Sequence, residues 1–200
     1  MRGALAELVT VGYGRQVWLL TVAHGVNEFY SVALPPIIPL LVADLNVTYG
    51  QAGALITVYF VMYSVFQLPA GFLGDRLGRV WLLSGGMILM SVGLFVVATA
   101  GSYHAMIAGQ VVAGIGGSTY HPSGMSFISD LESAETEGRA MGIHGFGGVA
   151  GMALAPALIG GVATVYDWRL ALQAAVPIGL VYAVVFPILF AAPKSGPGPA

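Results

Sequence analysis

The chain has 200 residues, of which 57% are hydrophobic and only 8% are charged, and its mean hydropathy is +0.84. A soluble domain carries roughly 25% charged residues, so this composition excludes a water-covered exterior and makes the lipid bilayer the first expected partner. The net charge of -2 is small and gives no indication of the basic stripe that nucleic-acid binding needs, so no nucleic acid is expected as a partner. The absence of cysteine excludes disulfides and thiolate sites.

Six apolar runs follow one another along the chain, separated by short polar breaks. Each is about as long as a helix that crosses the hydrocarbon core, and a chain in lipid must satisfy its backbone hydrogen bonds internally. The sequence therefore predicts an all-α membrane protein. Its six transmembrane helices are expected near residues 17–42, 51–70, 80–100, 105–128, 140–165 and 170–192. Residues 193–200 are rich in glycine and proline and are typical of the start of a flexible cytoplasmic linker or tail.

The basic residues predict the orientation of these helices. With a cytoplasmic amino terminus, Arg169 alone lies outside. The other six of the seven basic residues then lie inside: Arg2, Arg15, Arg76, Arg79, Arg139 and Lys194. The positive-inside rule therefore predicts a multi-pass protein of the plasma (cell inner) membrane with both termini cytoplasmic.

Helix one carries a polar stripe on one face, because its members are three or four residues apart. They are Thr21, His24, Asn27, Glu28 and Ser31. Burial favours the neutral form of a carboxyl group, so a buried glutamate can take up and release a proton. Glu28 is the only acid well inside any of the six runs, and we assign proton coupling to Glu28 with His24. The alternative is a permanent pair that fixes helix packing.

Other polar side chains face the same predicted interior. The candidates for a substrate cavity are Asn27, Ser31, Tyr63, Gln67, Gln110, His121 and His144. Each can equally be a packed, hydrogen-bonded residue. Pro35, Pro36 and Pro39 predict a bend in the outer part of helix one. Gly147 and Gly151 form a G-x-x-x-G pair, which allows two helices to approach closely.

One motif follows the second helix. It reads Gly71-Phe72-Leu73-Gly74-Asp75-Arg76-Leu77-Gly78-Arg79. This resembles the signature of the major facilitator superfamily, with Val80 standing where a second basic residue often occurs. Glu137-Gly138-Arg139 and Asp167-Trp168-Arg169 are similar to the family's entries into helices five and six.

The resemblance implies that the chain is the six-helix, amino-terminal half of a transporter. In such transporters the motif is a conformational gate, here formed by Gly71, Gly74, Asp75, Arg76, Gly78 and Arg79. We predict that Asp130 and Glu132 are the ion-pair partners of Arg76 and Arg79. The two halves of this family are parallel repeats. A second six-helix half is therefore expected as partner, either this chain in a parallel homodimer or a separate or missing carboxy-terminal half.

The elements His24-x-x-Asn27-Glu28 and His121-Pro122 resemble the fosmidomycin-resistance branch of the family, which exports drugs in exchange for protons. The leading hypothesis is thus proton-coupled export of a small organic or drug-like molecule, driven by the proton gradient without a cofactor. Proton-coupled uptake of a small organic anion is the second hypothesis. A non-transporting scaffold or truncated product is the third.

Two kinds of chemistry are not expected. No nucleophile, base and orienting residue converge at a readable spacing, so the sequence does not predict an enzyme. The four histidines are scattered along the chain, and no metal site is expected.

Overall fold

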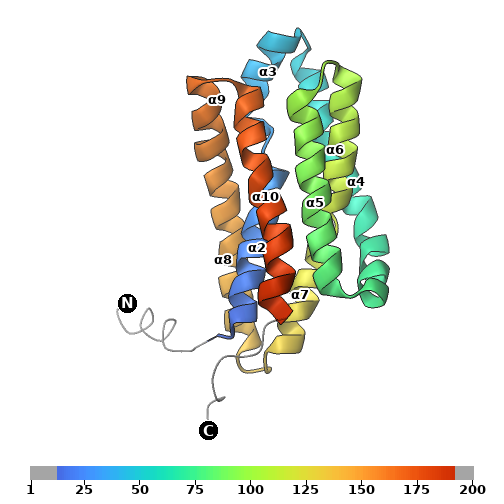
Figure 1. Cartoon of the computed structure of the whole chain (residues 1–200), viewed down its shortest axis with the longest axis vertical. Helices are drawn as coiled ribbons and strands as arrows, with labels where there is room; N and C mark the ends of the chain where they lie inside the picture. Colours follow the sequence, from blue (N-terminus) through green and yellow to red (C-terminus); the bar gives the residue numbers. More distant parts are fainter. Residues whose placement is uncertain (1–12, 192–200) are drawn as a thin grey trace.

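The computed structural model describes residues 13–191, and every regular element within that range is helical. The helices run side by side along the long axis of the molecule (Figure 1). The first residues of α2 and the last residues of α10 lie at the same end, which we call the lower end after its place in Figure 1. The predicted tail at 193–200, and also Arg2 and Lys194, lie outside the described residues.

The first membrane-length segment is a broken helix. It consists of α2 (Arg15–Ser31), the 3-10 turn η1 (Pro35–Ile37) and α3 (Ile38–Leu45). The break lies where the prolines predict it, because Pro35 and Pro36 have no amide hydrogen for the helical ladder. Asn46 ends α3 in the left-handed conformation, with φ 52°.

The second segment, α4 (Tyr49–Leu77), begins with a capping box. The Thr48 hydroxyl accepts from the Gln51 amide at 3.1 Å, and the Gln51 side chain accepts from the Thr48 amide at 2.8 Å. The helix then continues through most of the predicted gate loop. Only Gly78 makes the turn to α5 (Arg79–Thr99), at φ 86°, a conformation in which glycine has no Cβ to clash. The second helix is therefore longer than the predicted 51–70.

The fourth segment is divided into α6 (Tyr103–Gly117) and α7 (Tyr120–Leu131). Pro122 accounts for the break, because its ring clashes with the carbonyl of the residue four positions earlier, Ser118. The hydroxyls at the break bind backbone carbonyls three residues earlier. Ser118 Oγ donates to Ile115 O at 2.6 Å, and Thr119 Oγ1 donates to Gly116 O at 2.9 Å.

The fifth segment consists of α8 (Glu137–Ala155), the π-helical turn η2 (Pro156–Gly160) and α9 (Gly161–Val165). The last described helix is α10 (Trp168–Ala191). Five segments are long and apolar enough to cross a membrane, namely 15–45, 49–77, 79–99, 137–165 and 168–191. The divided α6 and α7 occupy the place of the remaining predicted helix, so six is an approximate number.

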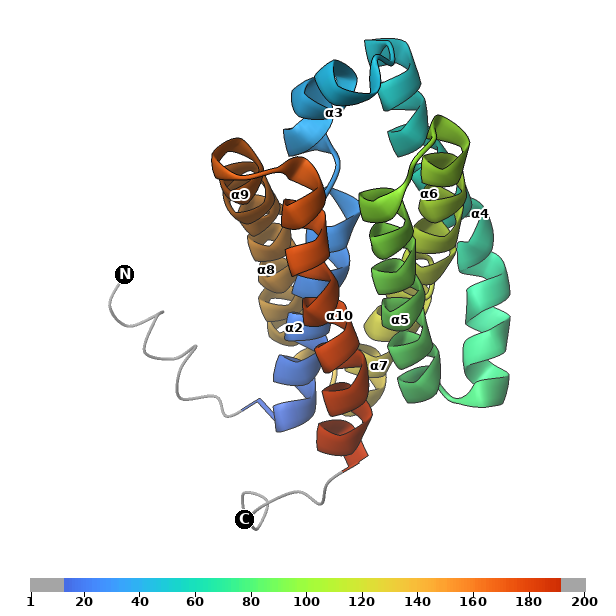
Figure 2. The ribbon, with the colours of Figure 1, turned by 45° about the horizontal axis from the view of Figure 1, so that its top comes forward.

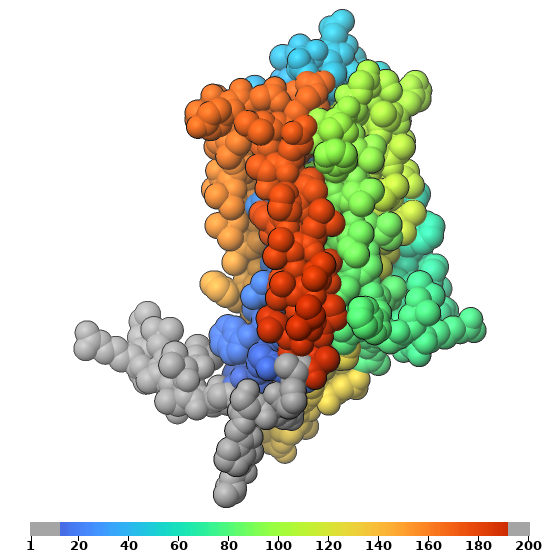
Figure 3. All heavy atoms as spheres, in the orientation of Figure 1, coloured from blue at the N-terminus to red at the C-terminus, as the bar shows by residue number. Residues whose placement is uncertain are grey.

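Two groups of helices form the bundle, as Figure 2 shows: α2, α8 and α10 in one, and α4, α5 and α6 in the other. The most extensive contacts are between α5 and α6, between α2 and α8, and between α10 and α5. α10 runs along α5 on the face seen in Figure 3 and so joins the two groups. Large apolar side chains cover much of the outer surface. Trp81 is 66% exposed and Ile188 is 64% exposed, which suits a surface that lipid covers.

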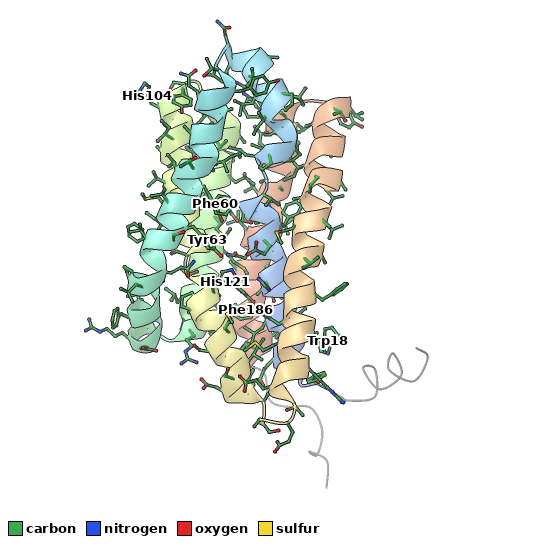
Figure 4. The ribbon with its side chains drawn as sticks, turned by 180° about the vertical axis from the view of Figure 1, so that it is seen from behind. Trp18, Phe60, Tyr63, His104, His121 and Phe186 are labelled. Carbon is green, nitrogen blue, oxygen red and sulfur yellow. The ribbon has the colours of Figure 1, made fainter. Side chains whose placement is uncertain are left out.

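The opposite face is seen in Figure 4, with α4 and α7 on one side, α8 on the other and α2 between them. We call it the open face. Phe60, Tyr63 and His121 lie on it near the middle of the bundle.

Candidate functional site

Glu28 lies on α2, three residues before this helix ends at Ser31, and its side chain is only 14% exposed. One carboxylate oxygen, Oε2, accepts from the Ser31 hydroxyl at 3.1 Å. The other, Oε1, faces two imidazoles, with His24 Nε2 at 3.7 Å and His121 Nε2 at 3.5 Å. We call His24, Glu28 and His121 the histidine–carboxylate cluster.

A backbone carbonyl of α8 orients the ring of His24. Its Nδ1 lies 2.9 Å from the carbonyl oxygen of His144. A carbonyl oxygen only accepts, so Nδ1 carries the hydrogen and the neutral ring has its lone pair on Nε2, which faces Glu28. The absence of a side chain on Gly148 makes room for this ring, since a Cβ there would lie 2.5 Å from Cε1 of His24.

His144 and Tyr120 form a buried layer behind the cluster. Their exposed fractions are 4% and 1%. The His144 ring stacks on His24 with the ring centroids 4.3 Å apart, and its Nε2 lies 3.0 Å from the Tyr120 hydroxyl. The Tyr120 hydroxyl donates to the Leu20 carbonyl at 2.5 Å, so it accepts from His144. His144 was predicted to line a substrate cavity, whereas the structure buries it as a support for His24.

Tyr120 was not among the residues predicted to form the site. Its position beside His121 and Pro122, at a helix break, was the available signal. The break at Ser118 and Thr119 redirects the chain so that α7 presents His121 to Glu28. The His121 side chain is 33% exposed, and it is the most accessible member of the cluster.

The other predicted cavity residues divide into two sets. Tyr63 contacts His121 with the ring centroids 5.9 Å apart, Gln67 lies half-buried one turn along α4, and Ser31 binds Glu28. Asn27 and Gln110, in contrast, are buried between helices. Asn27 Nδ2 donates to Gly117 O at 3.2 Å, and Gln110 Nε2 donates to Leu55 O at 3.3 Å. Both contribute to the packing of this bundle, because the rotation of their helices directs them between its helices.

The predicted gate motif lies at the lower end of the bundle, at the turn from α4 to α5. Arg79, and not Arg76, pairs with Asp130 on α7, with Nη1 2.5 Å from Oδ2. The guanidinium also lies over the Phe127 ring, 5.5 Å from its centroid. A Cβ on Gly74 would lie 3.3 Å from Ser123 Oγ, so glycine allows α4 and α7 to approach closely here. The pairing predicted for Arg79 with Asp130 is confirmed in this geometry.

A second charged contact lies at the end of the bundle opposite the lower end, which we call the upper end. Asp44 on α3 accepts hydrogen bonds from Trp168 Nε1, at 3.2 Å, and from Arg169 Nη1. The Arg169 guanidinium lies 4.2 Å from the centroid of the Trp168 ring. Asp167 begins α10 by accepting from the Arg169 amide at 2.7 Å. The Asp-Trp-Arg element thus ties α10 to the outer part of the first segment.

The structure corrects one premise of the sequence analysis. Three of the histidines are not scattered in space, because helix packing brings His24, His121 and His144 together. Single ligand atoms from His24, Glu28 and His121 lie within 4.8 Å of one another, which is compatible with a metal ion. His104 lies apart from them, near the upper end of the bundle in Figure 4.

Comparison with known proteins identifies several relatives. The Major Facilitator Superfamily model matches residues 17–200. The fosmidomycin resistance protein of Escherichia coli (strain K12) is 29% identical over 139 residues, which are 70% of this chain and 34% of that protein. The probable nitrate transporter NarT of Staphylococcus aureus (strain JH9) is 24% identical over 172 residues, which are 86% of this chain and 44% of that protein.

Solved structures share the fold. A bacterial homolog of the human lysosomal transporter Spinster, in an inward-facing and occupied conformation, matches with a TM-score of 0.78 at 19% identity. The match covers 90% of this chain and 44% of that one. The peptide transporter POT in complex with sulfate matches with a TM-score of 0.76 at 19% identity, over 88% of this chain and 38% of that one.

The helical bundle and its apolar exterior define one half of a major-facilitator-type fold. The chain belongs to the Major Facilitator Superfamily and is a multi-pass membrane protein, not an enzyme. It spans about a third to a little under half of the length of the curated relatives named above.

Proposed function

We propose that this chain performs proton-coupled secondary transport and exports a small organic or drug-like molecule, acting with a second six-helix half. One observation carries the proposal. Among the described residues, Glu28 is the acid that lies deep within the membrane-length segments, and it lies on the open face beside two imidazoles. Acids at such a depth are costly and mark ion and proton pathways in membrane proteins.

Glu28 takes up a proton from the outside and releases it to the inside, while substrate moves in the opposite direction. His24 and His121 are the nearest titratable side chains and exchange the proton with this carboxylate. Ser31 holds the second carboxylate oxygen and so limits the rotation of the group. The proton gradient is the driving force.

A second six-helix half covers the open face in this proposal. The matched relatives are more than twice as long as the part that this chain covers, which supports such a partner. The halves of this fold are parallel repeats, so a second copy of the chain or a separate half can supply it. We place the protein in the plasma (cell inner) membrane with the lower end cytoplasmic, because Arg76, Arg79 and Arg139 lie at that end.

Proton-coupled uptake of a small anion is the second candidate function. The name of the relative NarT favours it, as does the presence of two partly exposed imidazoles in the cluster. The two candidates predict opposite signs of accumulation. Whole cells that export should hold less of a labelled substrate when the proton gradient is present, and cells that take it up should hold more.

The test compares Glu28→Gln with Glu135→Gln, a matched change at an exposed acid in the turn between α7 and α8. Gradient-driven flux of the labelled molecule should fall to the background level in Glu28→Gln and stay at the wild-type level in the control. Equal flux in Glu28→Gln and wild type would refute the coupling role. No gradient-driven flux in any variant, with any partner half, would favour a scaffold or an inert product.

A further inference from the structure

We propose that the histidine–carboxylate cluster binds one divalent transition-metal ion of the Zn²⁺ class. Its three members lie on two helices, with His24 and Glu28 four residues apart on α2 and His121 on α7. One ligand atom from each lies within 4.8 Å of the others. The inference goes beyond the proposed transport function and does not depend on it, because it concerns equilibrium binding and not flux.

The distances in the cluster are longer than those of good hydrogen bonds and are compatible with a metal site. His24 Nε2 and His121 Nε2 lie 3.7 Å and 3.5 Å from Glu28 Oε1. Good hydrogen bonds of this type are about 2.7–3.2 Å long. Two ligands that each lie about 2.0–2.1 Å from a tetrahedral ion are about 3.4 Å apart. The observed spacing is therefore close to that of ligands around one ion.

The outer contacts of the cluster hold the ligand atoms in the required orientation. The hydrogen on His24 Nδ1 is given to the His144 carbonyl, which leaves the Nε2 lone pair free for a metal. The Ser31 hydroxyl binds Oε2 of Glu28, so that Oε1 points to the imidazoles. Metal-binding histidines and carboxylates in proteins are held in the same way, by one partner on the atom that does not ligate.

The donor set indicates the class of ion. Two imidazoles and one carboxylate suit Zn²⁺, Co²⁺ and Ni²⁺, whereas Mg²⁺ and Ca²⁺ prefer sites made only of oxygen. The side chains of His24, Glu28 and His121 are 12%, 14% and 33% exposed, so an ion can reach them from the open face. Three protein ligands leave a fourth position for water or for a donor group of a transported molecule.

The test uses the full chain, purified in detergent with an affinity tag that contains no histidine. Co²⁺ serves as the probe, because its visible absorption reports tetrahedral coordination. We expect one tetrahedral Co²⁺ per chain, displaced by an equivalent of Zn²⁺. The bands should be lost in His24→Gln, Glu28→Gln and His121→Gln and retained in the matched control His104→Gln. Ser31→Ala should weaken binding by about tenfold.

Two results would overturn the site: wild-type chain without tetrahedral Co²⁺, or Co²⁺ bands that survive in all three ligand variants. X-ray absorption of the Zn²⁺-loaded wild-type chain gives a measurement that does not depend on how the variants fold. It should detect two imidazole nitrogens in the ligand sphere, and fewer than two would also refute the proposal. Metal binding without Glu28-dependent flux would contradict only the proposed transport function, and flux without metal binding would contradict only this inference.

Discussion

Two pairs of helices in this bundle pack through glycine, and they use it differently. In α5 and α6, backbone meets backbone. A Cβ on Gly93 would lie 2.5 Å from both Ala113 N and Gly109 O. In α2 and α8, Gly147 and Gly151 bring the backbones together in the same way, but Gly148 instead makes room for the imidazole of His24.

This difference shows how one packing device serves two purposes. Lipid gives no hydrophobic driving force for helix association, so close van der Waals contact at small residues holds such helices together. Between α5 and α6 that contact serves only to pack the two helices together. Between α2 and α8 it also fixes an ionisable ring against a backbone carbonyl, and that ring forms part of the histidine–carboxylate cluster.

The largest expected effect comes from breaking the first pair. Gly93→Ala places a methyl group against backbone atoms of α6, which cannot move without separating the helices. We expect a loss of about 3 kcal/mol in the free energy of unfolding, measured by denaturation in detergent. Gly85→Ala on the same helix is the matched control, because its Cβ meets nothing within 4 Å. Equal stability of the two variants would contradict the close packing.

Gly148→Ala separates function from stability in the second pair. The atoms nearest to the added methyl group are those of the His24 ring, so we expect the ring to move and the helices to stay together. We expect a stability loss of no more than about 1 kcal/mol, together with clear losses of gradient-driven flux and of tetrahedral Co²⁺ absorption. Gly145→Ala on α8 is the control, since its Cβ has open space. Full flux and full Co²⁺ absorption in Gly148→Ala would show that the position of His24 does not matter.

Asn27 links α2 to α5 and α6. A substitution at this position tests whether its side chain contributes to packing or binds substrate. From α2 its amide donates to Met90 Sδ on α5 at 3.4 Å and to Gly117 O on α6 at 3.2 Å. Asn27→Ala should lower the free energy of unfolding by about 1 kcal/mol. Flux per folded molecule and its substrate dependence should not change. A changed substrate affinity with unchanged stability would show that Asn27 lines the substrate cavity.

The smallest effect is expected at the lower end, where Arg79 ties α5 to α7. Asp130→Arg should cost about 0.5 kcal/mol, because the Asp130 side chain is 65% exposed and water screens the pair. Adding Arg79→Asp should restore the stability, whereas adding Arg76→Asp should not. If Arg76→Asp restored the stability and Arg79→Asp did not, the partner of Asp130 would be Arg76 and not Arg79. Thermal unfolding at low ionic strength gives the most sensitive reading.

Several features of the fold could be predicted because they depend on residues close together in the sequence. Pro35 and Pro36 break the first segment where they stand, and Gly78 makes the turn of the signature motif. The predicted extent of the gate loop was wrong, because α4 stays helical as far as Leu77. The predicted helix ended with the apolar run, whereas the backbone stays helical past the charged Asp75 and Arg76 up to the turn at Gly78.

The candidate site was less predictable, because its geometry depends on how helices rotate against one another. Asn27 and Glu28 share the predicted stripe, yet the Asn27 amide binds acceptors on α5 and α6 while Glu28 faces the imidazoles of His24 and His121. His121 lies 93 positions after Glu28 in the sequence. The break before α7 brings the two side chains together. Tyr120 and the carbonyl of His144 enter the site by the same tertiary packing.

By itself the sequence determined an all-α, multi-pass membrane protein, because lipid imposes its demands residue by residue, in apolar length and few charges. The family was indicated by the resemblance of the motif at residues 71–79 to the superfamily signature, and the family model confirms it. The tertiary structure alone decided that His121 joins His24 and Glu28 in one cluster and that Asn27 and Gln110 are buried between helices. Such convergence depends on contacts between segments, and these are set by the crossing of whole helices and not by any local pattern.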